Sequence, residues 1–155
     1  MNPKDLDAFI PRLSEPMTPK DFRVLSNSRW PWKEAVLQER WQAYVVPTQE
    51  HVLNIMRTAD LLTRIELILN GPKVDILSWY RVPQYNKLVG GAPKSYHTQG
   101  LAIDFAVQGM SADKARELLR PKLDVLNCRL QNHPKGTTWL HVDLGAVGPS
   151  GRFFK

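Results

Sequence analysis

The stretch Ser95-Tyr96-His97-Thr98-Gln99-Gly100-Leu101-Ala102-Ile103-Asp104 runs into a predicted strand that covers residues 101–107. Successive side chains of a strand point to opposite faces, so the apolar residues at alternate positions share one face and Asp104 stands on the other, between two alanines. Gly100 can adopt the backbone conformation of a tight turn, which would bring the imidazole of His97 back over Asp104. We therefore expect His97 and Asp104 to lie side by side.

A second predicted strand, residues 138–144, has the same alternation. Its apolar side chains oppose His141 and Asp143, which share a face. If the two strands are neighbours with their apolar faces on a common core, Asp104 and His141 project together onto the opposite surface. Two neutral imidazoles and one carboxylate, with a fourth position left for water, are a recurrent catalytic zinc set. The pattern therefore favours a metal site, and the alternative is a surface pair or a hydrogen-bonded structural histidine.

Two motifs give the sequence a family resemblance. The pattern S-x-H-x-x-G-x-A-x-D at residues 95–104, followed by W-x-H-x-D at residues 139–143, resembles the zinc D-alanyl-D-alanine peptidase family, in the compact type often found in bacteria and phages. Upstream, S-W-Y-R at residues 78–81 and Y-N-K-L-V-G-G-A at residues 85–92 are similar to two further stretches of that family. The two motifs together are far more specific than either one alone.

The resemblance implies a fold, a cofactor and a set of site residues. The fold is that of the hedgehog-type and LAS-type peptidases, an α+β fold with a small central antiparallel sheet flanked by helices, whereas the order of the elements alone would also allow a parallel sheet. The cofactor is Zn²⁺, and the implied zinc ligands are His97, Asp104 and His141. Arg81 would lie in the cleft and stabilise the substrate carbonyl as it becomes an oxyanion.

Three residues beside the ligands are candidates for substrate binding. Ser95 could hydrogen-bond to substrate or could cap the turn that carries His97. Tyr96 and Gln99 are expected to line the cleft.

The general base is the one departure from the family pattern. Many members have a glutamate or aspartate three residues before the last zinc histidine, and this chain has Thr138 there. Hydrolysis still needs a proton shuttle to the leaving amine. Asp143 is the leading substitute, and its rival role is to fix the tautomer of a ligand histidine. His133 is a second candidate base, although a solvent-facing loop residue is the more ordinary interpretation.

The remaining elements follow from caps and breakers. Thr48 is an N-cap candidate for a helix that runs to Leu69, with a strand at residues 73–80 and a short helix at 82–89 after it. Ser111 is expected to cap a helix to about residue 119, with a kink or restart at Pro121 running towards residue 130. The only cysteine, Cys128, is expected as a buried thiol on that amphipathic helix.

Length and charge restrict the class of protein. The 155 residues form one expected domain, 1–155, in which the Pro- and Trp-rich residues 1–47 are a wrapping segment. The net charge of +6 favours an anionic partner, such as nucleic acid, a phospholipid headgroup or a wall polymer. The basic residues are dispersed without interleaved aromatic residues, which disfavours a specific nucleic-acid partner. No membrane span is expected, because the most apolar segment, 61–69, contains polar and charged residues.

These observations lead to a ranked set of hypotheses. The first is a zinc metallopeptidase that cuts bacterial peptidoglycan peptides, as a D,D- or L,D-type carboxypeptidase or endopeptidase. The second is a noncatalytic zinc-stabilised binding module, and a basic nucleic-acid adaptor is third. We expect a monomer. We also expect the protein to be made in the cytoplasm without an export signal, because residues 1–17 contain acids and prolines where such a signal has an apolar run. It would reach the cell wall after release, as a phage endolysin does, or as a virion component.

Overall fold

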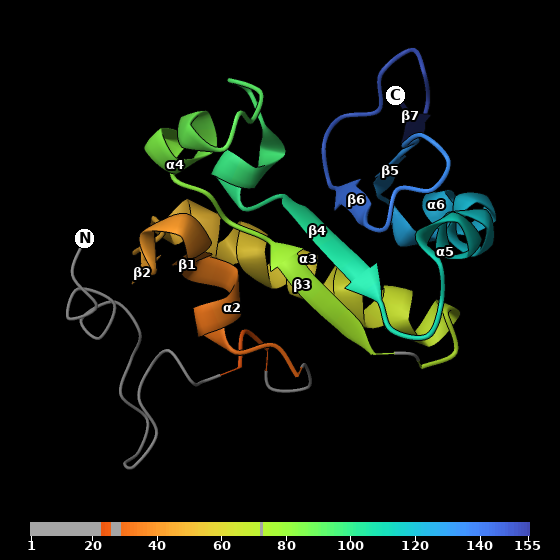
Figure 1. The fold of residues 1–155 in the computed structure, drawn as a ribbon, viewed down its shortest axis with the longest axis horizontal. Coiled ribbons are helices and arrows are strands. Elements are labelled where there is room, and N and C mark those ends of the chain that lie inside the picture. Colours follow the sequence, from red (N-terminus) through yellow and green to blue (C-terminus); the bar gives the residue numbers. More distant parts are fainter. Residues whose placement is uncertain (1–22, 26–28, 72) are drawn as a thin grey trace.

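The computed structural model describes residues 23–25, 29–71 and 73–155 (Figure 1). The predicted wrapping segment is residues 1–47, and most of its first half lies outside the described residues. Residues 1–17, on which the expectation of no export signal rests, lie outside them as well. None of the helices in the described ranges is both long and apolar enough to cross a membrane.

A five-stranded sheet forms the centre of the molecule. Its spatial order is β3-β4-β6-β5-β7, and every pairing is antiparallel except that of β5 with β7. The expected α+β fold with a small sheet flanked by helices is thus confirmed, and the parallel sheet that element order alone allowed is not formed. The strands are β3 (Val74–Ser78), β4 (Ala102–Val107), β5 (Arg129–Gln131), β6 (Leu140–Asp143) and β7 (Phe153–Phe154).

The pairing of β4 with β6 determines which polar side chains meet. Asp104 is the direct partner of His141, and Ala102 is the partner of Asp143. On the far side of β6, Asp143 is also the partner of Arg129 in β5. Directly opposed residues of an antiparallel pair have side chains on the same face, so Asp104, His141, Asp143 and Arg129 lie on one side of the sheet.

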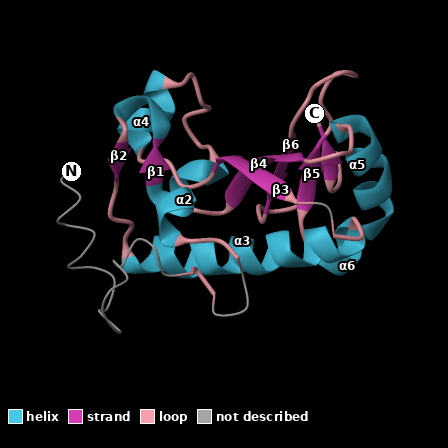
Figure 2. Ribbon diagram, turned by 60° about the horizontal axis from the view of Figure 1, so that its bottom comes forward, coloured by secondary structure: helices cyan, strands magenta, loops and turns pink. Residues whose placement is uncertain are grey.

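The long helix α3 (Gln49–Ile68) covers the other side of the sheet. Its first turn is capped by the Thr48 hydroxyl, which accepts from the His51 backbone N–H at 3.2 Å, as the sequence predicts. Figures 1 and 2 show that the helix runs across the sheet, and it buries an apolar stripe there. Fully burying one such side chain contributes roughly 1.5–3 kcal/mol. The stripe consists of Ile55, Ala59, Leu61, Leu62 and Ile65.

The region after β4 differs from the sequence-based expectation. The helix α5 (Ala112–Leu119) is capped by Ser111 as predicted, and a single turn, η4 (Arg120–Lys122), at Pro121 leads into α6 (Leu123–Leu126). The helix does not run on towards residue 130, because Asn127 takes a left-handed conformation with φ of 50° and ends it. Residues 129–131 form strand β5 instead, so Cys128 is buried between a helix and a strand and not on a helix.

Short elements make up the described residues 29–47 before α3, as the prolines of this segment predict. They are α2 (Trp32–Val36), β1 (Leu37–Gln38), η2 (Glu39–Trp41) and β2 (Ala43–Tyr44). The buried Gln38 side chain donates from Nε2 to the Tyr80 carbonyl at 2.9 Å and accepts from the Val82 N–H at 3.3 Å. This segment therefore holds the stretch that leads from β3 into α4 (Pro83–Leu88).

Candidate metal centre

His97 lies on η3 (Tyr96–Gln99), the single turn just before β4. The Ser95 hydroxyl caps this turn by accepting from the His97 N–H at 3.3 Å. Gly100 ends it with φ of 71°, and a Cβ at Gly100 would lie 3.0 Å from Ile55 Cγ1 of α3. The chain therefore turns tightly against α3 because residue 100 is a glycine. The His97 side chain is only 3% exposed as a result.

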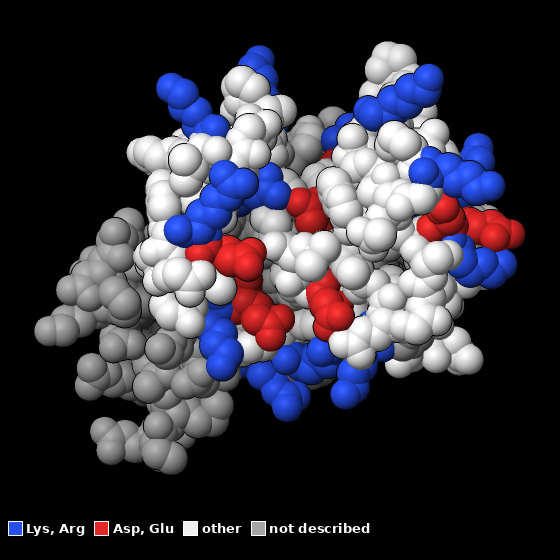
Figure 3. All heavy atoms as spheres, viewed as in Figure 1, with Lys and Arg blue, Asp and Glu red and all other residues white. Residues whose placement is uncertain are grey.

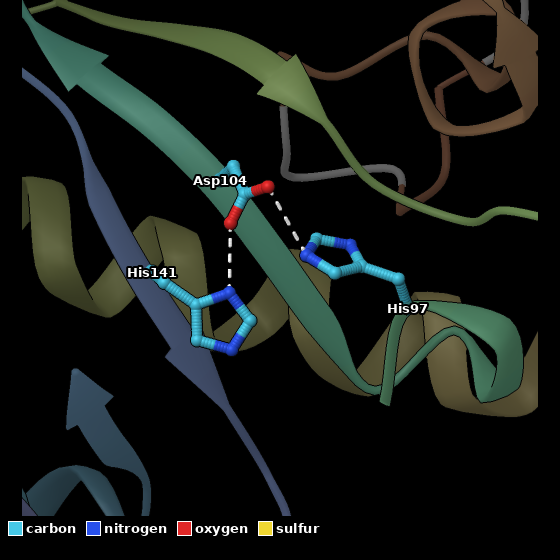
Figure 4. A group of neighbouring side chains, drawn as sticks. All are labelled: His97, Asp104 and His141. Atoms are coloured by element: carbon cyan, nitrogen blue, oxygen red, sulfur yellow. Dashed lines mark hydrogen bonds and ion pairs between the residues drawn. The ribbon is translucent and has the colours of Figure 1, made fainter. Parts of the chain in front are cut away.

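Three side chains from three elements meet above the sheet. His97 Nε2 lies 3.1 Å from Asp104 Oδ2, and His141 Nδ1 lies 2.7 Å from Asp104 Oδ1. One ligand atom from each residue falls within 4.8 Å of the other two. Figure 4 shows both imidazoles turned towards the carboxylate, on the side of the sheet away from α3. The structure thus brings together the three residues that the resemblance implies as zinc ligands.

The hydrogen bonds around His97 show that this donor set suits a cation. His97 Nδ1 lies 2.7 Å from the Trp79 carbonyl oxygen, which can only accept, so Nδ1 carries the hydrogen. In the neutral imidazole the lone pair of Nε2 then faces the Asp104 carboxylate, an acceptor. The two atoms lie 3.1 Å apart and can coordinate the same cation. Two imidazole nitrogens and one carboxylate oxygen are ligands that zinc prefers.

Burial and hydrogen bonding shift the pKa values of all three groups. Burial lowers the pKa of His97 and keeps its imidazole neutral. For Asp104, burial acts to raise the pKa, but its interactions with His141 and His97 outweigh burial and hold the pKa well below its usual range. For His141, burial acts to lower the pKa, but its bonds to Asp104 and Asp143 raise it to about 9. The carboxylate is therefore ionised at neutral pH and available to a metal.

Arg81 lies beside the same carboxylate. Its Nη2 donates to Asp104 Oδ2 at 2.7 Å, its Nε donates to Ser78 Oγ at 2.7 Å, and its backbone N–H donates to the His97 carbonyl at 3.0 Å. The side chain is largely buried, so its charge has a defined position next to the ligand set.

Asp143 has contacts on both of its carboxylate oxygens. Oδ1 accepts from Arg129 Nε at 2.7 Å and from the Gly145 N–H at 2.8 Å. Oδ2 accepts from Arg129 Nη2 at 2.9 Å and lies 3.3 Å from His141 Nε2. The side chain is only 1% exposed. Arg129 was missed by the sequence reasoning because the predicted helix ran towards residue 130, and a strand of three residues is too short to show a period.

Three further residues considered in the sequence analysis, Tyr96, Gln99 and Thr138, differ in their exposure and contacts. Tyr96 packs near the Arg129 guanidinium, with 5.1 Å from the guanidinium carbon to the ring centroid. Gln99 is exposed, and its backbone carbonyl accepts from Asn54 Nδ2 at 2.9 Å. Thr138, at the position of the family's usual carboxylate, is exposed and precedes β6.

His133 lies on the loop between β5 and β6 and not freely in solvent. Its ring packs on Trp139 at a centroid distance of 4.2 Å, and Nε2 is buried without a hydrogen-bond partner in the described part of the chain. Burial and the charges of Arg116 and His141 lower its pKa, so the ring is neutral at pH 7. It borders a surface cavity of about 680 Å³ that Arg116 and Phe153 also line.

The face in Figure 3 is hollowed between the part of the molecule with α4 and the part with β5, β6 and β7. Lys and Arg side chains stand on both sides of the hollow. In Figure 1, β6 and the turn just before β4, which carry His141 and His97, border this region.

A His–Asp–His donor set with one position left open is of the kind found in catalytic zinc sites. The comparison with protein families agrees, because the model described as Peptidase M15 matches residues 32–143, well over half of the chain. The chain therefore belongs to the Peptidase M15 family, the zinc D-alanyl-D-alanine peptidases. No curated protein matches the chain.

Proposed function

We propose that this protein is a zinc-dependent peptidase that hydrolyses peptide bonds in bacterial peptidoglycan, as a D,D- or L,D-type carboxypeptidase or endopeptidase. The observation that carries the proposal is the set formed by His97, Asp104 and His141, whose ligand atoms lie within 4.8 Å of one another. Zinc in such a set supplies Lewis acidity, which lowers the pKa of water and polarises a carbonyl group.

Arg81 stabilises the negative charge that develops on the scissile carbonyl oxygen. A guanidinium is charged at any relevant pH, and Ser78 and Asp104 hold this one beside the metal ligands. A donor that is already in position when charge develops lowers the barrier without reorganisation.

Asp143 is better suited to orienting His141 than to accepting a proton. Its two oxygens already accept from Arg129, Gly145 and His141, and the side chain is 1% exposed. We therefore assign the role of general base to His133, the second candidate from the sequence analysis. Its ring is neutral and its Nε2 has no hydrogen-bond partner among the described residues, so a local movement that uncovers Nε2 would leave this nitrogen able to accept a proton.

The charge of the molecule supports an anionic peptide substrate. The chain carries +6, and basic side chains stand on both sides of the hollow in Figure 3. Wall peptides carry free carboxylates, which such a field attracts. We place the site of action at the cell wall, in the role of a phage endolysin or virion component, with the protein acting as a monomer.

A muropeptide digest followed by mass spectrometry tests this function. We expect cleavage products with the zinc-loaded protein, none after chelation, and recovery when zinc is added back. His141→Ala should be inactive and metal-free, whereas His51→Ala, which alters a histidine of α3 bonded to Tyr80, should retain both properties.

The second candidate function is a noncatalytic zinc-stabilised module of the same fold, which the threonine at position 138 favours. A protein that binds one zinc per chain, binds muropeptides and releases no products from any of them would establish that alternative. Absence of zinc binding would reject both functions.

A further inference from the structure

Arg129 and Asp143 form a bidentate ion pair beside the candidate metal centre, on the same face of the sheet. They are direct cross-strand partners in β5 and β6, and the guanidinium donates from Nε and Nη2 to the two carboxylate oxygens at 2.7 and 2.9 Å. The Arg129 side chain is 14% exposed, and the Asp143 side chain is 1% exposed. The planar fork of an arginine matches a carboxylate in this way, and the match fixes the orientation of the carboxylate as well as its charge.

The orientation of Asp143 has a consequence for His141. Asp143 Oδ2 lies 3.3 Å from His141 Nε2, and an ionised carboxylate can only accept. When a metal displaces the proton from Nδ1, the hydrogen that Asp143 accepts stays on Nε2 and the lone pair of Nδ1 becomes available. Nδ1 is the nitrogen that faces Asp104, at 2.7 Å. The ring thus presents to the metal position the nitrogen that is free to coordinate.

Two aromatic rings hold Arg129 itself. Its guanidinium carbon lies 4.4 Å from the ring centroid of Phe154 and 5.1 Å from that of Tyr96. Phe154 comes from β7 and also lies edge-on to His141 with centroids 6.2 Å apart, while Tyr96 adjoins the ligand His97 on η3. These contacts restrict the guanidinium to the plane that Asp143 requires.

We infer that Arg129 is a positioning residue of the metal centre, which acts through Asp143 to hold His141 in the tautomer and orientation that bind zinc. The inference rests on the metal site of the proposed function. It goes beyond that function because it assigns to a residue outside the ligand set a defined part in metal affinity. Residues that orient a ligand histidine typically contribute about 10- to 100-fold to metal affinity.

Zinc affinity measured by chelator competition tests the inference without any assay of activity. We expect Arg129→Met to bind zinc about 10- to 100-fold more weakly than the unaltered protein. The matched control is Arg152→Met. Arg152 also donates to a carboxylate and an amide, those of Asp124 at 2.8 Å and Asn127 at 3.0 Å, and within the described residues it bonds to neither histidine of the site nor to Asp143. The control should bind zinc within about twofold of the unaltered protein, a difference near the error of such titrations.

Two further measurements separate positioning from a purely structural ion pair. In the zinc-loaded protein, the Nε2–H proton of His141 should give a slowly exchanging NMR signal that is lost or broadened in Arg129→Met and retained in Arg152→Met. In an Asp143→Ala background, Arg129→Met should weaken zinc binding little further, because a residue that acts through Asp143 has no effect once Asp143 is removed.

The outcomes distinguish this inference from the proposed function. If the unaltered protein binds no zinc, the metal site and the inference both fail. If it binds zinc and Arg129→Met binds equally well with the His141 signal intact, the inference alone is wrong. If Arg129→Met does not fold because a buried carboxylate loses its partner, Arg129→Lys keeps the charge but not the fork, and unchanged affinity in that variant overturns the inference equally.

Discussion

The two histidines proposed as metal ligands are held by different hydrogen bonds and present different nitrogens. His97 donates from Nδ1 to the Trp79 carbonyl and presents Nε2, whereas His141 has Nε2 beside Asp143 and presents Nδ1. Each ring thus has its second nitrogen bonded to the protein, which is how metal-binding imidazoles are usually oriented. At this scale, the chemistry of the site depends on a few residues that touch the ligands without being ligands.

Arg81 gives the first prediction. We expect Arg81→Ala to lower kcat by roughly 100-fold or more, because the charge beside the reacting carbonyl is lost. Zinc content, measured by atomic emission, should stay at about one ion per chain, the capacity of a single three-ligand set. Arg81→Lys should recover little of the rate, since lysine cannot bond to Ser78 and Asp104 at once as Arg81 does. Normal turnover of Arg81→Ala would remove Arg81 from the catalytic site.

The identity of the general base gives the second prediction. We expect His133→Ala to lower kcat about 100-fold or more at saturating zinc, because a proton acceptor is lost, with zinc affinity unchanged. Asp143→Asn should instead weaken zinc affinity about 10- to 100-fold and lower kcat less when zinc is saturating. Kinetics measured against free zinc concentration separate the two effects. A loss of kcat confined to Asp143→Asn at saturating zinc would return the base to Asp143.

At the scale of elements, the turn η3 and the helix α3 together position His97. Gly100 ends η3 with φ of 71°, and its Cα faces Ile55 of α3. The placement of a metal ligand therefore depends on the close packing of a turn against a helix on the other side of the sheet.

Gly100→Ala is the third prediction. We expect it to lower the free energy of unfolding by about 2–4 kcal/mol, because strain at positive φ adds to a Cβ that meets Ile55 at 3.0 Å. Gly109→Ala is the matched control, because Gly109 has φ of 73° but no atom within 4 Å of the added Cβ. That variant should lose only about 1–2 kcal/mol. Urea denaturation measures the free energy of unfolding of both variants. Equal losses would mean that contact of the added Cβ with α3 does not contribute to the destabilisation of Gly100→Ala.

At the scale of the whole molecule, the buried residues of the sheet, α3, α5 and α6 form one core. Cys128 lies in this core at 1% exposure, and burial raises the pKa of its thiol to about 12. The thiolate is the reactive form, and at pH 8 only about one molecule in ten thousand carries it.

The reactivity of Cys128 is the fourth prediction. In the folded protein at pH 8, a thiol reagent should modify Cys128 only as fast as the core opens, and urea should release full reactivity. Raising the pH from 7 to 9 should increase the rate no more than it increases that of a free thiol, because Cys128 reacts only in the opened state, in which burial no longer raises its pKa. Rapid modification in the native protein would show that the core around α6 and β5 opens readily.

Local patterns in the sequence determined most of the elements and the placement of the candidate metal ligands of β4 and β6. Thr48 and Ser111 cap α3 and α5, and the alternation of β4 and β6 places Asp104 and His141 on one face, because capping and strand periodicity act over a few neighbouring residues. The formation of β5 and β7 and the position of Arg129 beside Asp143 depend on the tertiary structure alone. Strands of three and two residues are too short to show a period, and they form because neighbours satisfy their backbone groups, as when the Leu130 N–H donates to the Arg152 carbonyl at 2.7 Å.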